Sequence, residues 1–160
     1  MRVYQRVLIT GASRGLGAAL ARELLAHGYS VMSVARSQED LRREIDALPP
    51  AQRERADCRV CDLADPRAAG ALVDAVQSRF GDLDVLINNA GAGAFKPLVQ
   101  WSPDELAAGV HLNLLAPMLL ARAVLPGMIE RRRGMIVNIA SDLARRPLAN
   151  MAPYVAAKHG

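Results

Sequence analysis

Hydrophobic residues along this 160-residue chain alternate between short continuous runs and longer stretches with helical spacing. The runs predict strands at about residues 3–10, 30–35, 57–61, 83–88 and 135–140. All but 57–61 are nearly continuous in Val, Ile and Leu, which is typical of strands covered on both faces of a parallel sheet. The stretches predict helices at about residues 14–27, 38–47, 66–80 and 103–132, and a last helix beginning near Pro153.

Strands and helices therefore alternate along the whole chain. Right-handed connections between parallel strands place helices on both faces, which predicts an α/β fold with a doubly wound parallel sheet. No linker, repeat or low-complexity segment interrupts residues 1–160, so a single domain is expected. Ligands of such sheets bind outside the carboxyl ends of the strands, and candidate functional residues are sought there.

Local signals mark the ends of the longest predicted helix. Ser102 is predicted as its N-cap, with proline at the first helical position and Glu105 completing a capping box. The helix is expected to bend near Pro117 and Pro126, because proline removes an internal hydrogen bond, and to stop at Gly134.

Composition and charge exclude several classes of protein. Hydrophobic residues make up 51% of the chain and charged residues 22%, as in ordinary globular domains. The net charge of +4 is scattered apart from runs at Arg131–Arg133 and Arg145–Arg146, which are expected to be a solvated helix end and a loop. No continuous basic stripe accompanies a helix or strand that could contact nucleic-acid bases, so nucleic acid is not an expected partner.

A cytoplasmic location without membrane association is expected. The first predicted strand begins almost at Met1, which leaves no room for a signal peptide. The most apolar stretch, Leu112–Met128, contains Asn113, Arg122 and two prolines and is expected to be too short for a membrane span.

Cys58 and Cys61 form a C-x-x-C pair within the third predicted strand. An odd separation puts the two side chains on opposite faces of a strand, and no second pair or nearby histidine completes a zinc site. Two reduced, non-catalytic thiols are therefore favoured over a metal site.

The first predicted strand ends in a glycine-rich turn, Thr10–Gly17, with the spacing G-x-x-x-G-x-G. Gly11 allows a sharp turn, Gly15 allows the backbone to approach a ligand, and Gly17 allows the helix to pack closely on the strand. The free N–H groups and dipole of the following helix favour an anion such as a pyrophosphate. The alternative is an ordinary strand-to-helix turn.

Further polar groups follow other strands: Asp62, the segment Asn88–Gly91, and Ser141. Tyr154 and Lys158 share one helical face, so the ammonium can lie near the phenol and favour its ionised form. Such a tyrosine can act as a general acid or base, whereas an isolated Y-x-x-x-K pair can equally be an incidental surface feature.

Together these stretches resemble the classical short-chain dehydrogenase/reductase family over the whole chain. The resemblance implies a Rossmann fold and a catalytic tetrad of Asn113, Ser141, Tyr154 and Lys158. It implies cofactor contacts from Gly11, Ser13, Arg14, Gly15, Leu16, Arg36, Asp62, Leu63, Asn89, Ala90 and Gly91, together with Tyr154 and Lys158.

The resemblance also implies a role for each tetrad residue. Tyr154 would protonate the substrate oxygen as hydride arrives from a nicotinamide, and Lys158 would hold the ribose hydroxyls and favour the phenolate. Ser141 would orient the carbonyl, and Asn113 would hold a water in a proton relay. The alternative for Asn113 is a polar side chain satisfied inside a bent helix.

Charge at the end of the second predicted strand indicates which nicotinamide cofactor binds. An acid there accepts hydrogen bonds from the ribose of NAD, whereas arginine suits the 2′-phosphate of NADP. Arg36 stands at this position, no acid occurs before Glu39, and Arg14 lies in the glycine turn. NADP(H) is therefore the expected cofactor.

Members of the family continue beyond the tyrosine helix with two more strands and a substrate-covering segment. The chain is therefore expected to be a fragment holding the first five strands, with residues 135–140 as an uncovered edge and a homo-oligomer formed by the full-length protein. The expected function is NADP(H)-dependent interconversion of a small-molecule carbonyl and a secondary alcohol. The alternatives are a catalytically impaired NADP-binding or interaction module, and an epimerase or dehydratase. The substrate itself is not predicted.

Overall fold

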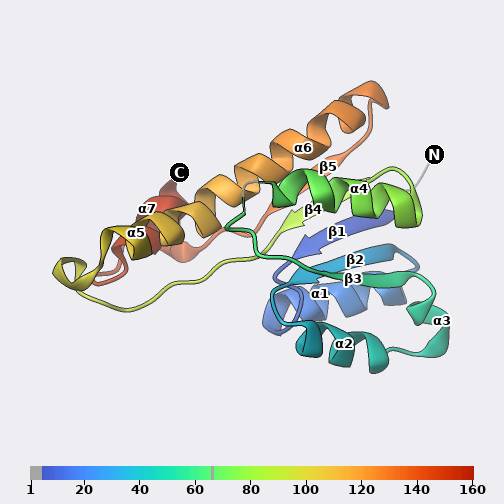
Figure 1. The fold of residues 1–160 in the computed structure, drawn as a ribbon, viewed down its shortest axis with the longest axis horizontal. Coiled ribbons are helices and arrows are strands. Elements are labelled where there is room, and N and C mark those ends of the chain that lie inside the picture. Colours follow the sequence, from blue (N-terminus) through green and yellow to red (C-terminus); the bar gives the residue numbers. More distant parts are fainter. Residues whose placement is uncertain (1–4, 66) are drawn as a thin grey trace.

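A computed structural model describes residues 5–65 and 67–160. Five parallel strands form one sheet in the order β3-β2-β1-β4-β5 (Figure 1). The strands are β1 (Arg6–Thr10), β2 (Ser30–Ala35), β3 (Ala56–Val60), β4 (Val85–Asn88) and β5 (Met135–Asn138). The predicted doubly wound α/β fold is confirmed.

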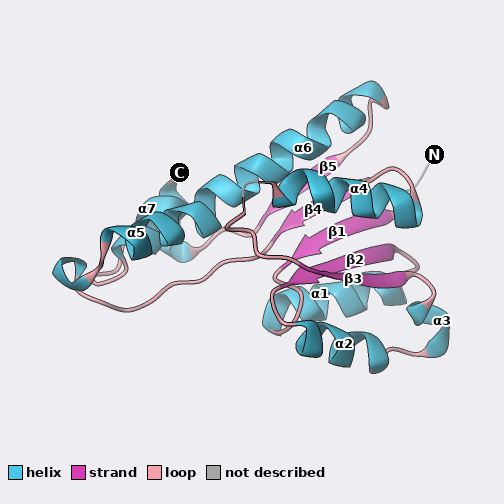
Figure 2. Cartoon of the chain, in the orientation of Figure 1, coloured by secondary structure: helices cyan, strands magenta, loops and turns pink. Residues whose placement is uncertain are grey.

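Helices cover both faces of this sheet (Figure 2). One face carries α1 (Gly15–Ala26), α2 (Gln38–Asp46) and the short α3 (Pro50–Arg53). The other face carries α4 (Ala68–Phe80) and α6 (Ala116–Glu130), the latter continuous with α5 (Pro103–Val110). The helix α7 (Ala152–His159) packs against α5, beyond the carboxyl ends of β4 and β5.

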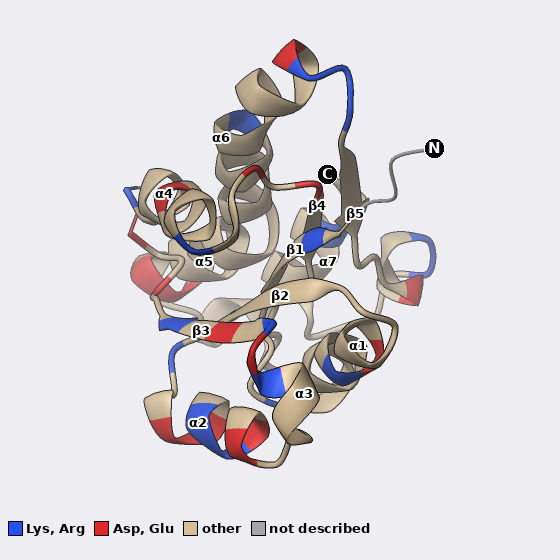
Figure 3. Cartoon of the chain, turned by 90° about the vertical axis from the view of Figure 1, so that its right-hand side faces the viewer, with Lys and Arg blue, Asp and Glu red and all other residues tan. Residues whose placement is uncertain are grey.

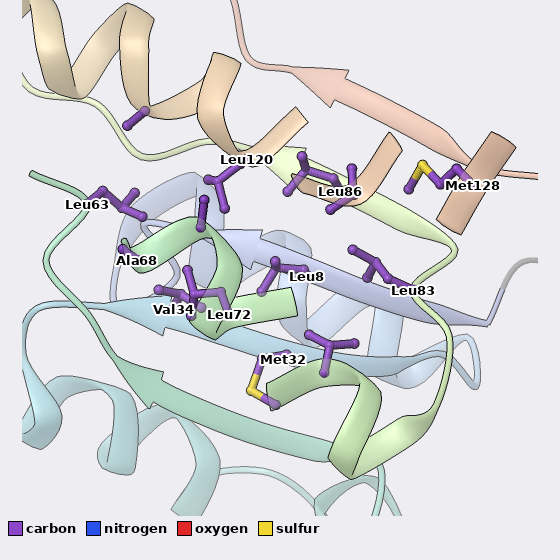
Figure 4. Close-up of a cluster of buried hydrophobic side chains, with 14 residues drawn as sticks. Leu8, Met32, Val34, Leu63, Ala68, Leu72, Leu83, Leu86, Leu120 and Met128 are labelled. Atoms are coloured by element: carbon purple, nitrogen blue, oxygen red, sulfur yellow. The ribbon is translucent and has the colours of Figure 1, made fainter. Parts of the chain in front are cut away.

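The continuous apolar runs are explained by this double covering. Successive strand residues point to opposite faces, so Leu8 joins one core cluster while Val7 and Ile9 join the other. Figure 4 shows the first cluster, in which Leu8 and Leu86 of the sheet lie below Leu120 of α6. The two edge strands depart from the pattern: every residue of β5 is exposed or half-buried, and in β3 only Ala56 is buried.

Several predicted boundaries agree with the structure to within a few residues, and β2 matches at both ends. The capping box at Ser102 and Glu105 is confirmed. The first two residues of the first predicted strand, residues 3–4, and Pro66 at the start of a predicted helix lie outside the described residues. No helix was predicted between α2 and β3, but Pro50–Arg53 forms the single turn of α3, opened by its proline.

The long helix is interrupted in a way that the prediction did not include. A π-helical turn, His111–Leu115, joins α5 to α6 just before Pro117, and Pro126 lies inside α6. Its widened bond runs from the N–H of Ala116 to the carbonyl of His111. Pro117 has no N–H to give to the carbonyl of Asn113 four residues earlier, so the α-helical pattern cannot continue through this turn.

The basic run after α6 is not a solvated helix end, contrary to the prediction. Arg131 pairs with Asp82, and Arg133 pairs with Asp84, so both guanidinium groups lie over the amino edge of the sheet. Helix α6 already ends at Glu130, because Arg132 adopts a positive φ of 47°. Arg145 and Arg146 are exposed, as expected, and Figure 3 shows acidic and basic residues interspersed along α2.

The helical run Pro103–Glu130 contains 28 residues and is apolar enough to cross a membrane by length and composition alone. This differs from the expectation that no stretch reaches such a length. Leu120, Val124 and Met128 of this run are buried in the core cluster shared with α4, and 28% of its most apolar stretch is buried.

A buried carboxylate joins the amino ends of β1 and β4. Asp84 is 1% exposed, and its Oδ2 accepts hydrogen bonds from the N–H of Gln5 at 2.9 Å and from the N–H and Nε of Arg6, both at 3.1 Å. Its Oδ1 lies 3.2 Å from Nε of Arg133. Burial alone would raise the pKa of Asp84, but these hydrogen bonds and cations outweigh it and lower the pKa.

Replacing this carboxylate should therefore reduce stability in a pH-dependent way. A lowered folded-state pKa stabilises the protein above the unfolded-state pKa of about 4, and that contribution is lost as pH falls through the folded-state pKa. We expect Asp84→Asn to lose about 3–5 kcal/mol of unfolding free energy at pH 7, with the deficit narrowing well below pH ~4. Urea unfolding of the wild-type and variant proteins in these two pH ranges measures the loss of unfolding free energy, with Asp74→Asn, at an exposed position, as the control. An equal loss in both pH ranges would contradict the role of the Asp84 carboxylate.

Candidate active site

The turn between β1 and α1 has the geometry of an anion cradle. Gly11 and Gly15 have positive φ angles of 68° and 57°, which side chains rarely adopt. A Cβ on Gly17 would overlap the carbonyl oxygen of Gly11, whereas a Cβ on Gly15 would meet no atom within 4 Å. Among the described residues no side chain caps the N-terminus of α1, so its first N–H groups face the open side of the turn.

The end of β4 holds this turn in place. The hydroxyl of Thr10 accepts hydrogen bonds from the N–H groups of Asn89 at 3.2 Å and Ala90 at 3.0 Å. In return, the side-chain amide of Asn89 donates to the carbonyls of Thr10 at 2.9 Å and Gly11 at 3.2 Å. The backbone N–H and both amide protons of Asn89 are thus used to shape the turn, and its oxygen atoms remain the part available to a ligand.

Residues predicted to contact the adenosine half of a cofactor follow β2 and β3. Arg14 and Arg36 are exposed, and the residue after Arg36 is the N-cap of α2. Asp62 is also exposed, although one of its carboxylate oxygens accepts the N–H of Ala64 at 3.0 Å. Leu63 is buried, and its carbonyl is held by Nε2 of His111 at 3.0 Å.

Asn113 lies in the π-helical turn, with its side chain 5% exposed and fully engaged. Its amide donates to the carbonyls of Ala92 at 2.8 Å and Gly109 at 2.9 Å, and its oxygen accepts the N–H of Ala92 at 3.2 Å. The side chain therefore fixes the segment that follows β4. Only the backbone of Asn113 is left for a role in proton transfer.

Lys158 and Tyr154 lie beside the same segment. The ammonium of Lys158 donates to the carbonyl of Ile139 at 2.8 Å and lies 5.7 Å from the centroid of the Tyr154 ring. A Cβ on Gly91 would lie 3.9 Å from this ammonium and 2.8 Å from Oδ1 of Asn113. The ammonium is thus anchored at the end of β5, between the tyrosine and the asparagine.

Ser141 lies two residues beyond Ile139 and opens the short helix η3 (Asp142–Ala144). Its Oγ accepts the N–H of Leu143 at 3.2 Å, which leaves the hydroxyl proton free to donate to another oxygen. Because α7 packs against both η3 and the π-helical turn, the four predicted tetrad residues come from elements that meet at one end of the sheet.

Sequence reasoning missed three residues that support this region: His111, Gly93 and Met151. His111 holds the carbonyl of Leu63, while Gly93 lies against both Tyr154 and Met151. Proximity of the Tyr-Lys helix to the segment after β4 could have drawn attention to Gly93. No local pattern marks His111 or Met151.

The two cysteines have no part in this arrangement. Both thiols are free and half-buried. Burial, together with neighbouring Asp57 for Cys58 and Asp62 for Cys61, raises the pKa of each thiol and keeps it in the unreactive protonated form. Within residues 5–65 and 67–160, no three His, Cys, Asp or Glu side chains gather as a metal site.

Comparison with known proteins yields consistent matches. A family model described as short chain dehydrogenase matches residues 5–160. The ketoacyl reductase HetN of a Nostoc species is 40% identical over 154 residues, which cover 96% of this chain and 53% of that protein. The chain spans between 53% and 59% of the length of three curated relatives that it matches.

Two solved structures are similar over nearly the whole chain. A metagenomic short-chain oxidoreductase in complex with NADP is 42% identical, with a TM-score of 0.87, covering 96% of this chain and 70% of that one. A variant of actinorhodin polyketide ketoreductase with NADPH is 36% identical, with a TM-score of 0.89, covering 100% of this chain and 62% of that one.

Proposed function

Because the chain belongs to the short-chain dehydrogenase family, we propose that it takes part in NADP(H)-dependent interconversion of a carbonyl and a secondary alcohol. The observation that carries the proposal is the position of Lys158, whose ammonium is fixed on the carbonyl of Ile139 beside the Tyr154 ring. This arrangement places a fixed positive charge beside the side chain that we propose transfers the proton.

The residues present fit a nicotinamide dinucleotide. The uncapped N-terminus of α1 and the open side of Gly15 would hold the pyrophosphate, and Asp62 and Leu63 would contact the adenine. Arg14 and Arg36 would pair with the 2′-phosphate of NADP, an assignment supported by the NADP and NADPH in the two compared structures. When bound, the cofactor supplies or accepts the hydride.

In the direction of reduction, Tyr154 donates its proton to the substrate oxygen while the carbonyl carbon gains hydride, which gives a secondary alcohol. The hydroxyl of Ser141 donates a hydrogen bond to the same oxygen and orients the carbonyl. Lys158 stabilises the phenolate that remains. Asn113 holds a relay water through its backbone carbonyl, because its side chain is engaged by Ala92 and Gly109.

A ketoacyl compound is the substrate class that we would test first. Relatives at 36–40% identity are described as ketoacyl reductases. Near Tyr154, the segment after β4 and the segment before α7 are joined by a hydrogen bond of 2.8 Å from Lys96 N–H to the Asn150 carbonyl. These segments expose Phe95, Val99 and Leu148, apolar side chains suited to an acyl chain.

Removal of the phenol hydroxyl should separate binding from turnover. We expect Tyr154→Phe to lose at least about 100-fold in kcat for NADPH-dependent ketoacyl reduction, because the general acid is absent. NADPH affinity, measured by fluorescence titration, should change little. Tyr29→Phe serves as the control, because it removes the hydroxyl of a half-buried tyrosine that packs against the core cluster containing Val7 and Ile9. A Tyr154→Phe protein with the original kcat would refute the assignment.

Reversal of charge at residue 36 should change cofactor preference. Arg36→Asp removes a charge-assisted hydrogen bond to the 2′-phosphate and adds repulsion, so we expect NADPH to bind about 30-fold or more weakly. NADH affinity should be retained or improved. Isothermal titration with both cofactors measures the change, and exposed Arg145→Asp controls for net charge. Equal weakening for NADPH and NADH would contradict the role of Arg36.

A further inference from the structure

Gly93 lies against the aromatic ring of Tyr154. A Cβ at this glycine would lie 3.1 Å from Cδ2 and 3.2 Å from Cγ of the ring, and 2.9 Å from Cε of Met151. These separations are shorter than ordinary van der Waals contact, which begins near 3.4 Å. The ring of the proposed general acid therefore occupies space that is available only because residue 93 has no side chain.

The backbone at Gly93 is held on both sides. On one side, the buried side chain of Asn113 forms hydrogen bonds with both the N–H and the carbonyl of Ala92. On the other side, the N–H of Lys96 donates to the carbonyl of Asn150 at 2.8 Å. Gly93 therefore cannot retreat from the ring without breaking one of these connections.

The backbone of Tyr154 is also held. Its neighbour Pro153 is buried and lies against α5, where a Cβ on Gly109 would come within 3.1 Å of the Pro153 Cβ. Lys158, one turn along α7, is anchored to the carbonyl of Ile139. A methyl group added at residue 93 would thus be accommodated mainly by displacement of the Tyr154 ring or of the flexible end of Met151.

We propose that Gly93 is a positioning residue for Tyr154: with Met151, it forms the surface on which the ring packs and so fixes the phenol relative to Lys158 and Ser141. The inference rests on the proposed function. Displacement of a reacting group by about 1 Å can cost 100-fold in rate, so a contact of this kind affects turnover more than binding.

The test is Gly93→Ala, alone and combined with Met151→Ala. We expect the single variant to lose about 10- to 100-fold in kcat for NADPH-dependent ketoacyl reduction, with substrate KM and NADPH affinity changed by less than about threefold. Met151→Ala removes the atom 2.9 Å from the new methyl and opens space beside it, so residue 93 can tilt by the few tenths of an ångström that the ring contact requires while its neighbours' hydrogen bonds are kept. The double variant should recover most of the lost kcat.

A second measurement does not depend on turnover. The Tyr154 ring signals in an aromatic NMR spectrum, assigned by their loss in Tyr154→Phe, should shift in Gly93→Ala and return toward their original positions in the double variant. Gly70→Ala is the matched control, because its Cβ would meet nothing within 4 Å on α4. It should change neither kcat nor the ring signals.

Unchanged ring signals in Gly93→Ala would overturn the inference, as would a loss of kcat that Met151→Ala does not relieve. If Tyr154→Phe is inactive while Gly93→Ala keeps the original kcat, the inference fails and the proposed function stands. If Tyr154→Phe retains the original kcat, the proposed function fails, and the ring signals still decide whether Gly93 positions Tyr154.

Discussion

The site depends on the hydrogen bonds that join the carboxyl ends of β1 and β4. Four hydrogen bonds cross this junction: the Thr10 hydroxyl accepts from the N–H groups of Asn89 and Ala90, and the Asn89 side-chain amide donates to the carbonyls of Thr10 and Gly11. From β1 the chain adds β2 and β3 on one side of the sheet, and it then returns to add β4 and β5 on the other side. The junction of β1 and β4 is therefore the point where the strand order reverses. Ligands of doubly wound sheets bind at such a point, and here the same bonds shape the glycine turn on one side.

On the other side of this junction, the segment after β4 connects the hydrogen-bonded turn to the proposed catalytic residues. Asn113 fixes Ala92, the next residue packs against the Tyr154 ring, and Gly91 lies beside the Lys158 ammonium. Small residues at 91 and 93 let backbone, asparagine, lysine and phenol approach one another closely. The glycine turn and the proposed catalytic side chains are thus parts of one hydrogen-bonded and packed unit, although its residues are widely separated in sequence.

The strands could be predicted because a sheet covered on both faces leaves an unbroken apolar signal, as in β2. The glycine turn and the Tyr-Lys pair were also visible, since their chemistry depends on local spacing. Contacts between distant segments were not: Arg131 and Arg133 pair with acids that precede β4, and His111 reaches the carbonyl of Leu63. The π-helical turn arises from the missing N–H of Pro117 together with tertiary contacts of Asn113, so proline alone suggested only a bend.

In the proposed function, hydride passes between a nicotinamide cofactor and a carbonyl carbon. This transfer can be followed with NADPH carrying deuterium at both C4 positions of the nicotinamide, a ketoacyl thioester as substrate, and mass spectrometry of the alcohol. We expect deuterium on the new carbinol carbon, in step with consumption of the cofactor. Bound cofactor without any labelled alcohol, or a product formed with no net change in the cofactor, would contradict it.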